Sequence, residues 1–549
     1  MFSVKDIEIK NIDHLGIVAG IVDSIGLVEI INNFCGQETG EKVSAGHVVK
    51  AMILNGLGMV SKPLYMFPKF FESIACEHLI GDGVKPEYLN DDKLGRVMDK
   101  LFLKGLDTIF LAISLNVVKK FGISLASSHL DSSSFHVHGE YKNSLPEVIF
   151  PRIGDIQLPE ASELKSPQAI NVTYGYSRDH RPDLKQFIME LVCSGDGDIP
   201  IFLKAASGNQ ADSACFGAIA VEYQNQIKID SLIVADCALY TEANLKLMSK
   251  IKWLSRVPLT LKSAKSLVIT LPESEFIKSE LDGYSYVEKK VSYAGIEQRW
   301  LVVQSHLRIK ADLRKLSKAI EKSLSSAKTK LKTLSQEKFA CAADAMKALS
   351  KISKKFKHHE IDKIEITEKT PDVKGEKPNK YYHISATLSK NENAIDIETK
   401  SAGRFIIATN VLESKELGND QMIREYKAQQ SCERGFGFLK DPLFFTDSIF
   451  IKSPERIEAL AMIMGLCLLV YTLAQRQIRA ALSASQSTVK NQLGKSINNP
   501  TLRWIFQCFE SIHLVTLNQE TDISNLNPER NFILTLLPED CRRYYTCIT

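Results

Sequence analysis

The stretch SLIVADCALY, residues 231–240, predicts the fold class. Residues 232–235 form a short apolar run that ends abruptly at Asp236, and a polar, helix-like stretch follows from Thr241. A continuous apolar run of this length is typical of a parallel strand that is buried on both faces. Open α/β sheets bind ligands at the carboxyl ends of such strands, so Asp236 is predicted to lie at a functional site.

A second acid lies on an earlier predicted strand. Residues 125–137 are rich in Ser, Val, Leu and Phe in a partly alternating pattern, which predicts a strand that carries Asp131. Either aspartate alone would be interpreted as a cap or turn residue. His136 and His138 share one face of this strand, but no Cys or third His completes a zinc set nearby, so a zinc site is the weaker interpretation.

A third acid lies in YKAQQSCERGFGFLK, residues 426–440, which predicts a helix. Tyr426 precedes Glu433 by seven residues and Lys440 follows it by seven, so the three side chains are predicted to share one helix face. A carboxylate beside an ammonium and a phenol suits a metal ion next to a phosphate. A solvated amphipathic helix is the alternative for this segment taken alone.

The three acids in this order resemble those of DDE insertion-sequence transposases, in the branch with a Tyr-x2-Arg-x3-Glu-x6-Lys signature. Tyr426, Glu433 and Lys440 match that spacing, whereas Gln429 stands where the signature has Arg and brings no charge to a phosphate. Three further blocks are similar to the family: YGYSRDHRPDLKQ at 174–186, GNQAD at 208–212 and GRFIIATN at 403–410.

The resemblance implies an α/β fold with a ribonuclease-H-like core, in which Asp131, Asp236 and Glu433 are the catalytic and metal-binding residues. It implies two Mg²⁺ ions, for which Mn²⁺ can substitute, with Asp131 bridging them, Asp236 on one ion and Glu433 on the other. Such a pair activates the attacking oxygen and stabilises the leaving one. The implied activity is cutting of double-stranded DNA at terminal inverted repeats and joining of the 3′ ends to target DNA, by a homodimer in a synaptic complex.

Two weaker functions remain open. A related nuclease would cut without joining, and a DNA-binding descendant would have lost the chemistry. The three intact acids argue against the descendant, while Gln429 keeps it open.

Six residues are predicted to contact DNA: Tyr426, Gln429, Lys440, Arg181, Lys185 and Trp300. Asp179 and Asp183 flank Arg181, so an internal ion-pair network is the alternative for that turn. A core tryptophan is the alternative to base stacking for Trp300 and for Trp253.

The 549 residues are too many for one ordinary domain and predict two to four domains. Along the chain, five segments are predicted. These are a helical N-terminal domain at 1–120 for end binding or pairing, the first part of the core at 121–255, an insertion at 256–400, the last part of the core at 401–452, and a helical C-terminal region at 453–549. Predicted strands of the core include 169–177, 185–194, 231–238 and 251–258, and 213–226 is a predicted helix. Residues 43–60 are predicted to form a helix capped by Ser44.

The insertion has β-rich ends and a basic, amphipathic helical middle. Between Arg308 and Lys357 there are fifteen Lys or Arg against four Asp or Glu, with leucines at helical spacing. We expect DNA contact there, because basic clusters supply sequence-independent affinity; a solvated helix is the alternative. Residues 1–120 hold thirteen basic and fifteen acidic side chains and give no such indication.

Composition predicts an intracellular globular protein, and the resemblance implies one of the bacterial cytoplasm that is associated with the nucleoid. Apolar residues make up 44% of the chain, the net charge is +4, and the eleven cysteines form no CxxC pair. The N-terminus lacks the apolar core of a signal peptide. Residues 459–474 are strongly apolar but short and closely bounded by charges, so a buried core helix is expected and no membrane partner.

Overall fold

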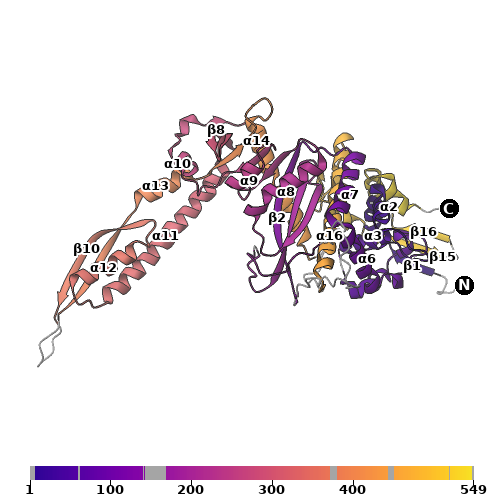
Figure 1. Ribbon diagram of the computed structural model, residues 1–549, viewed down its shortest axis with the longest axis horizontal. Coiled ribbons are helices and arrows are strands. Elements are labelled where there is room, and N and C mark those ends of the chain that lie inside the picture. The colour runs from indigo at the N-terminus through magenta and orange to yellow at the C-terminus, as the bar shows by residue number, and fades with distance from the viewer. Residues whose placement is uncertain are drawn as a thin grey trace, which may run out of the picture. The chain divides into compact units, whose positions relative to one another are not determined.

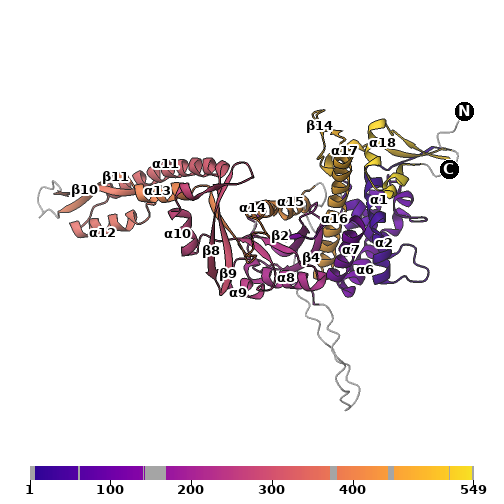
Figure 2. The same ribbon diagram turned by 90° about the horizontal axis from the view of Figure 1, so that it is seen from above.

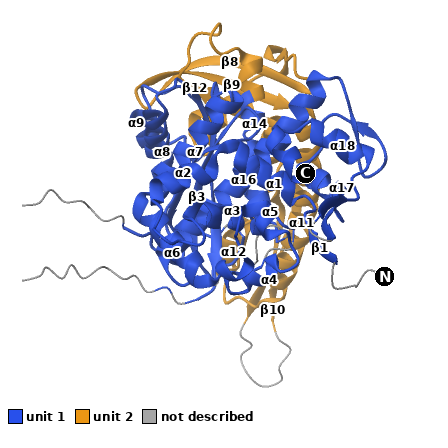
Figure 3. Ribbon diagram, turned by 90° about the vertical axis from the view of Figure 1, so that its right-hand side faces the viewer, with its two compact units in different colours: residues 1–254, 425–549 blue, residues 255–424 orange. Residues whose placement is uncertain are grey.

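The computed structural model describes residues 7–59, 62–139, 141, 168–177, 179–370, 380–442, 451–517 and 520–546. It is a mixed α/β protein with two compact units, shown in different colours in Figure 3. Unit 1 comprises residues 1–254 and 425–549, and unit 2 comprises residues 255–424. The finer division into five segments stays a prediction.

The sheet of unit 1 carries the acids on its strands. Its strands are β2 (Ser127–Val137), β3 (Lys185–Ser194), β4 (Pro200–Ser207) and β5 (Leu232–Ala235), in the order β4-β3-β2-β5. β2 is antiparallel to β3 and parallel to β5. The strands predicted around Asp131, at 185–194 and before Asp236 are therefore confirmed, and the sheet is mixed. The predicted strand at 251–258 is β6 (Trp253–Arg256), which spans the boundary between the units.

Helices cover both faces of this sheet, as Figure 2 shows for α8 and α15 on opposite sides of β2. On one face, the Tyr223 hydroxyl of α8 (Asp212–Ile227) shares a 2.8 Å hydrogen bond with Ser128 Oγ of β2. On the other face lie α15 (Gln430–Leu439) and α16 (Pro454–Ala484). A Cβ on Gly465 of α16 would overlap the Leu203 side chain of β4, so this glycine lets the long helix lie directly on the sheet.

The N-terminal part of unit 1 is mostly helical, as predicted. Ser44 caps α3 by accepting a hydrogen bond from the His47 backbone N–H, which confirms the predicted start of that helix. The helices longer than five residues here are α1 (Leu15–Ile25), α2 (Leu27–Cys35), α3 (Ala45–Gly56), α6 (Asp91–Lys104) and α7 (Leu106–Phe121).

The C-terminal region, predicted to be helical, contains helices and also two strands of a small sheet. Besides α17 (Leu502–Cys508), α18 (Pro528–Thr535) and α19 (Glu539–Arg542), the region contains β15 (His513–Leu517) and β16 (Glu520–Ser524). These strands form a three-stranded antiparallel sheet with β1 (Ile7–Asn11). The partner of β15 lies at the opposite end of the chain, so local periodicity around residue 513 gives no sign of the pairing.

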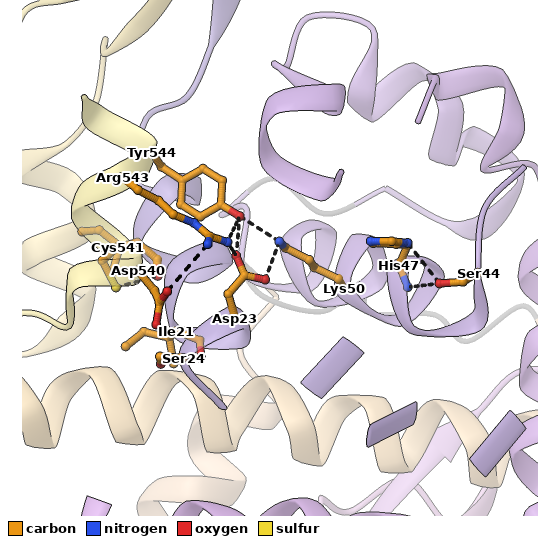
Figure 4. Close-up of polar contacts among 11 residues, drawn as sticks. Ile21, Asp23, Ser24, Ser44, His47, Lys50, Asp540, Cys541, Arg543 and Tyr544 are labelled. Atoms are coloured by element: carbon orange, nitrogen blue, oxygen red, sulfur yellow. Dashed lines mark hydrogen bonds and ion pairs between the residues drawn. The ribbon is translucent and has the colours of Figure 1, made fainter. Parts of the chain in front are cut away.

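A buried ion cluster fastens the C-terminal turn to the N-terminal helices (Figure 4). The Lys50 ammonium, 3% exposed, donates to Asp23 Oδ1 at 2.7 Å and to the Tyr544 hydroxyl at 2.9 Å. Arg543 and the Tyr544 hydroxyl also bind the second oxygen of Asp23. Burial lowers the pKa of Lys50, and Asp23 opposes that effect. Removing one member of such a pair leaves an uncompensated buried charge, so the cluster ties the two chain ends together.

α16 contains the apolar stretch at 459–474. Among the helices of the described chain, α16 is long and apolar enough to cross a membrane, and 83% of its most apolar window is buried within the protein. The bent helix pairs Leu15–Ile25 with Leu27–Cys35, and Asp91–Lys104 with Leu106–Phe121, pass the same test of length and composition if each pair is taken as one span. The burial of α16 agrees with the predicted core helix.

Unit 2 contains strands in the order β12-β9-β8-β7 and a separate helix–hairpin layer. The strands are β7 (Ile277–Lys278), β8 (Tyr284–Tyr293), β9 (Ile296–Ser305) and β12 (Arg404–Thr409), and β7, β8 and β9 lie in the predicted β-rich first end of the insertion. Figure 1 labels α11 (His306–Gln336), α12 (Ala342–Ser353) and α13 (Glu392–Ser401), and the hairpin strand β10 (His359–Lys369), which pairs with β11 (Tyr381–Lys390). The basic stretch thus forms two helices.

The strand predicted at 169–177 is absent; a single bridge from Thr173 to Gln186 is the only β-pairing of those residues in the described chain. The segment instead lies against the turn after β4. The Gln186 side-chain amide donates to the backbone carbonyls of Tyr176 and Gly208, at 3.2 and 2.7 Å. A Cβ on Gly175 would overlap the Gly208 carbonyl, so this contact depends on glycine.

Candidate functional site

Asp131 and Asp236 come from neighbouring parallel strands. Leu130 of β2 is the Cα partner of Ala235, the last residue of β5, and each aspartate follows directly after its member of that pair. Both carboxylates are half-buried. The register therefore places the two acids side by side at the end of β5, where the sequence predicts a site.

The two acids belong to the sheet face that α15 covers. Asp131 is paired across the ladder with Leu191 of β3, and paired residues in an antiparallel ladder point to the same face. A Cβ on Gly435 of α15 would lie 3.4 Å from the Leu191 side chain. Phe135, four residues after Asp131 and hence on the same face, has its ring 6.4 Å from that of Phe436.

Glu433 is carried on α15, which lies on β2 and β3 through a buried stripe. The preceding residue, Cys432, donates its thiol to the His129 carbonyl of β2 at 3.0 Å. Glu433 itself is exposed. The buried side of the helix consists of Ser431, Cys432, Gly435, Phe436 and Leu439. The helix that carries the third acid is thus fixed over the strand that carries the first.

The predicted continuous helix over 426–440 is interrupted. α14 (Asn419–Ala428) ends before Gln429, which lies in a turn with helical backbone angles, and α15 begins at Gln430. Lys440 is the C-cap of α15. Tyr426 therefore belongs to a different helix from Glu433. The predicted common helix face can apply only to Glu433 and Lys440, both at α15. The interruption falls on the position where the signature has Arg.

The donor set of the three acids is made of carboxylate oxygens, which is the chemistry that Mg²⁺ prefers. Asp131 Oδ1 accepts the Ser132 backbone N–H at 2.8 Å, and Asp236 Oδ1 accepts the Ala238 backbone N–H at 2.8 Å. No group of three or more His, Cys, Asp or Glu side chains within the described ranges is close enough to hold one ion. The acids fit the metal in ligand type, and the three carboxylates have not converged on one ion position in this structure.

Lys440 lies at the end of the same face, against the block at 174–186. Its ammonium forms a 2.9 Å ion pair with Asp179 Oδ2 and lies 5.4 Å from the centre of the Phe135 ring. His136 Nδ1 is 3.5 Å from the same Asp179 oxygen, and its Nε2 is 2.9 Å from Ser177 Oγ. Burial lowers the pKa of His136, and Asp179 opposes that effect. Of these groups, Lys440, Asp179, His136 and Phe135 line a pocket of about 800 Å³ within unit 1.

The remaining predicted DNA contacts have other partners in this structure. The Arg181 guanidinium binds both oxygens of Asp183, at 2.9 and 2.7 Å, and this bond lowers the pKa of Asp183 to about 2. Lys185 donates to the Tyr141 carbonyl at 3.3 Å. Trp300 is 1% exposed and donates to Gln298 Oε1, so it is a core residue and has no ring face open to a base.

The face of the sheet that α8 covers holds a polar cluster that the sequence analysis missed. Ser132, next to Asp131, donates to Asp212 Oδ1 at 2.6 Å. Glu190, which pairs with Ser132 across the ladder, is 1% exposed and accepts a 2.6 Å hydrogen bond from the Gln210 amide. Burial raises the pKa of Glu190 to about 7. Gln210 and Asp212 belong to the GNQAD block, which was a usable signal for this cluster.

His129, two residues before Asp131 and on the same face, was also missed. Its ring is fully buried, 3.9 Å from Glu425 Oε2, and neither ring nitrogen has a hydrogen-bond partner among the described residues. Burial lowers the pKa of His129 to about 4, so the imidazole is neutral at neutral pH. A neutral ring beneath α15 adds no positive charge beside Asp131.

Comparison with known proteins shows similarity to one described family and to solved structures. Residues 7–115 match a family described as "Domain of unknown function (DUF4277)". No curated protein matches the chain. Among solved structures, a chain of "Cryo-EM structure of piggyBac transposase synaptic complex with hairpin DNA" is similar at 9% identity and a TM-score of 0.37, over 97% of this chain and 82% of that chain. A TM-score of 0.37 is too low to show that the two chains share a fold.

Proposed function

We propose that this chain is a transposase that cuts double-stranded DNA at the terminal inverted repeats of an insertion sequence and joins the 3′ ends to target DNA. The observation that carries the proposal is the register of β2 and β5, which sets Asp131 and Asp236 side by side. α15, which carries Glu433, lies over β2 on the same face. The signature spacing from Glu433 to Lys440 adds support from the sequence.

The arrangement suits a phosphodiester because it combines carboxylates, which can bind cations, with the ammonium of Lys440, which can bind a phosphate. Lys440, at the end of the acidic face, would neutralise part of a phosphate's charge once it exchanges Asp179 for that phosphate. Tyr426 would donate a hydrogen bond to the DNA backbone, and Gln429 would do so without charge. The core that holds them would be of the ribonuclease-H type.

Asp131, Asp236 and Glu433 would bind two Mg²⁺ ions, for which Mn²⁺ can substitute. When bound, the ions would activate the attacking oxygen and stabilise the leaving one. The half-burial of both aspartates lets solvent reach their carboxylates, and the exposure of Glu433 leaves its side chain able to rotate toward the sheet. A movement of this side chain on metal and DNA binding belongs to the proposal.

One observation favours a second candidate, the DNA-binding descendant that does not cut. The three acids have not converged, and the break at Gln429 separates Tyr426 from α15. Binding without chemistry would need only the basic surfaces of the chain. The related nuclease that cuts but does not join is the third candidate.

The test is Mg²⁺-dependent cleavage and strand joining on DNA that carries the inverted repeats flanking the gene. We expect the wild type to cut and join, and Glu433→Gln to bind the same DNA without doing either. Glu242→Gln is the matched control, because Glu242 is an exposed glutamate of α9 (Glu242–Leu247) that lies outside the proposed site. It is expected to cut and join like the wild type.

Each other outcome identifies one of the alternatives. Cutting without joining would assign the nuclease, and binding without cutting in Mg²⁺ or Mn²⁺ would assign the descendant. Full activity of Glu433→Gln would show that the third acid is misassigned. A homodimer that holds two DNA ends, in the bacterial cytoplasm at the nucleoid, is part of the same proposal; the mass of the DNA complex by light scattering tests the dimer.

A further inference from the structure

The segment of unit 2 that contains α11 and α12, residues 308–357, presents a basic surface, which we call the basic face. All fifteen of its Lys and Arg side chains are exposed. The basic face consists of Arg308, Lys310, Arg314, Lys315, Lys318, Lys322, Lys328, Lys330, Lys332, Lys338, Lys347, Lys351, Lys354, Lys355 and Lys357. The same stretch contains four acidic residues, Asp312, Glu321, Glu337 and Asp344.

On α11, the buried apolar residues lie on one side of the helix and the basic residues lie on the solvent-facing side. Leu316, Ala327 and Leu334 are its buried residues, and at 3.6 residues per turn they share one side. Leu334 packs with Ala345 and Leu349 of α12 and Ile384 of β11 in a small separate core. The basic residues of α11 fall on the remaining, solvent-facing side, because the apolar side is packed on α12 and the hairpin.

The hairpin and α13 of the same layer have a different charge. Over residues 358–370 and 380–401, they hold five basic and seven acidic side chains. Lys380 pairs with Glu368, and Lys400 pairs with Asp396. A surface that served only solubility would need no such division of charge between two parts of one layer.

The basic face is almost without internal counter-charge. Within the described part of the chain, the fifteen side chains form two ion pairs, Arg308 with Asp312 at 3.6 Å and Lys357 with Glu398 at 2.7 Å. The remaining cations face solvent and have no carboxylate within ion-pair distance among the described residues. Their complement is a polyanion with closely spaced charges, and duplex DNA carries one charge per about 1.7 Å of helix axis.

The length of α11 suits a duplex lying along it. Thirty-one residues at about 1.5 Å each give a helix of about 46 Å, equal to roughly 14 base pairs at about 3.4 Å per pair. Long, flexible Lys side chains along one helix can reach successive phosphates of such a duplex. Phosphate contacts position a protein on DNA but carry no sequence information, so binding there would be independent of sequence.

We infer that the basic face binds the phosphate backbone of duplex DNA outside the cleavage site, and so holds flanking or target DNA whatever its sequence. This inference rests on the proposed function for the presence of DNA. It adds a second, non-catalytic contact on unit 2, which cleavage chemistry alone would not require.

The test compares two triple variants of the full-length chain. Lys315, Lys318 and Lys322 lie on the solvent side of α11, and the first variant is K315E/K318E/K322E. The control, K363E/K369E/K390E, changes the net charge equally at exposed positions of the hairpin. Binding to a fluorescent duplex of about 40 base pairs and arbitrary sequence is measured by anisotropy in EDTA from about 50 to 300 mM salt.

We expect the helix variant to make the slope of log Kobs against log salt shallower by about 2.7, which is about 0.9 for each phosphate that is no longer neutralised. The hairpin control is expected to keep the wild-type slope. Equal weakening in both variants would show a general effect of net charge, and no weakening in the helix variant would show that DNA does not lie there; either result overturns the inference. Circular dichroism and the melting temperature of both variants establish that they fold.

The outcomes separate this inference from the proposed function. EDTA removes the chemistry, so a cleavage defect does not affect the measurement. If the wild type binds and the helix variant binds equally well, the basic face alone is misassigned. If the wild type binds no duplex at all, both proposals fail. A helix variant that loses binding to polyglutamate but not to the duplex would assign the surface to an acidic protein and overturn the inference.

Discussion

The two faces of the sheet in unit 1 are built from the same strands and use polar side chains in opposite ways. On the α8 face, Ser132 and Glu190 are each 1% exposed and are held by Asp212 and Gln210. On the α15 face, Asp131 is half-buried and lies beside an acid from the next strand. One face uses its polar groups to fix β2, and the other presents carboxylates that solvent can reach.

The alternation of a strand explains how adjacent residues serve such different purposes. Asp131 and Ser132 are neighbours in sequence, and successive side chains point to opposite faces. The hydrogen bond of Ser132 on the α8 face therefore fixes the backbone that positions Asp131 on the other. If this comparison is right, substitutions on the two faces will have separable effects on activity and on stability.

The largest effect is expected on the α15 face. Asp131→Asn keeps the shape of the side chain and removes its charge, so the proposed metal site loses a ligand. We expect cleavage to fall by about 1000-fold or more, because ligand charge supports several kcal/mol of transition-state stabilisation. The measurement is the initial rate of DNA cleavage in Mg²⁺.

The control for this substitution is Asp230→Asn. Asp230 is an exposed acid of unit 1 that pairs with Lys252 and is not on the α15 face. It is expected to leave the cleavage rate near that of the wild type. Similar decreases for the two variants would mean that the α15 face has no special role.

Because Glu190 on the α8 face is buried, we expect the stability of the protein to depend on pH. The pKa of Glu190 in the folded protein is about 7, above its ordinary value of 4.5. The stabilisation of the fold by the protonated side chain is therefore fully present below pH 4.5 and is lost as pH rises through 7. The decrease between pH 5 and 8 is about 2–3 kcal/mol for this group. Glu190→Gln removes the ionisation and is expected to flatten that part of the unfolding free energy, measured by urea denaturation at each pH.

A second glutamate, which is half-buried, provides the check on that assignment. Glu458 of α16 accepts the Ile170 backbone N–H at 2.6 Å, and burial raises its pKa to about 7 as well. Glu190→Gln should therefore remove about half of the combined decline, and the double variant with Glu458→Gln most of it. An unchanged pH profile in the double variant would show that neither glutamate has a raised pKa in the folded protein.

A smaller effect on activity is expected from the group that acts through β2. Asp212→Ala removes the acceptor of the Ser132 hydroxyl, and we expect cleavage to fall by about 10- to 100-fold, the range for groups that orient metal ligands. Asp212→Asn keeps an acceptor oxygen and should recover most of the rate. The distinguishing readout is the Mg²⁺ concentration for half-maximal rate, which should rise in Asp212→Ala while KM for DNA stays constant.

If Asp212 is merely structural, the melting temperature will fall in Asp212→Ala with no change in the Mg²⁺ requirement. That result would separate the α8 face from the chemistry and limit it to stability.

The sequence predicted the parts of this comparison that depend on local pattern. The alternation over 125–137 and the apolar run before Asp236 predicted both strands, and the second pattern also predicted that Asp236 follows the carboxyl end of its strand. The spacing within 433–440 predicted the helix that became α15, whereas the break at Gln429 was missed because its backbone angles are helical and no Gly or Pro marks it.

Long-range pairing was beyond the sequence pattern. The pairing of β1 with β15, and the hydrogen bonds of Gln210 and Asp212 to β3 and β2, join residues far apart in the chain. Local periodicity carries no information on such partners, so the polar cluster on the α8 face appeared only as an unexplained block of sequence. The strand that carries Asp131 could be predicted, but the hydrogen bonds that hold this strand from its other face could not.

The smallest effect is expected at the edge of the α15 face, where Lys440 is held by Asp179. Asp179→Asn removes this counter-charge, and we expect DNA affinity in EDTA at low salt to rise about 2- to 5-fold, because a partly exposed ion pair is worth about 0.2–1 kcal/mol. Asp183→Asn is the matched control, since it removes an equal charge from the same turn but releases Arg181. A gain for Asp179→Asn that exceeds the gain for the control would place the phosphate at Lys440, whereas equal gains would show that DNA has no preference for Lys440 over Arg181 and would leave the signature lysine without a specific DNA contact.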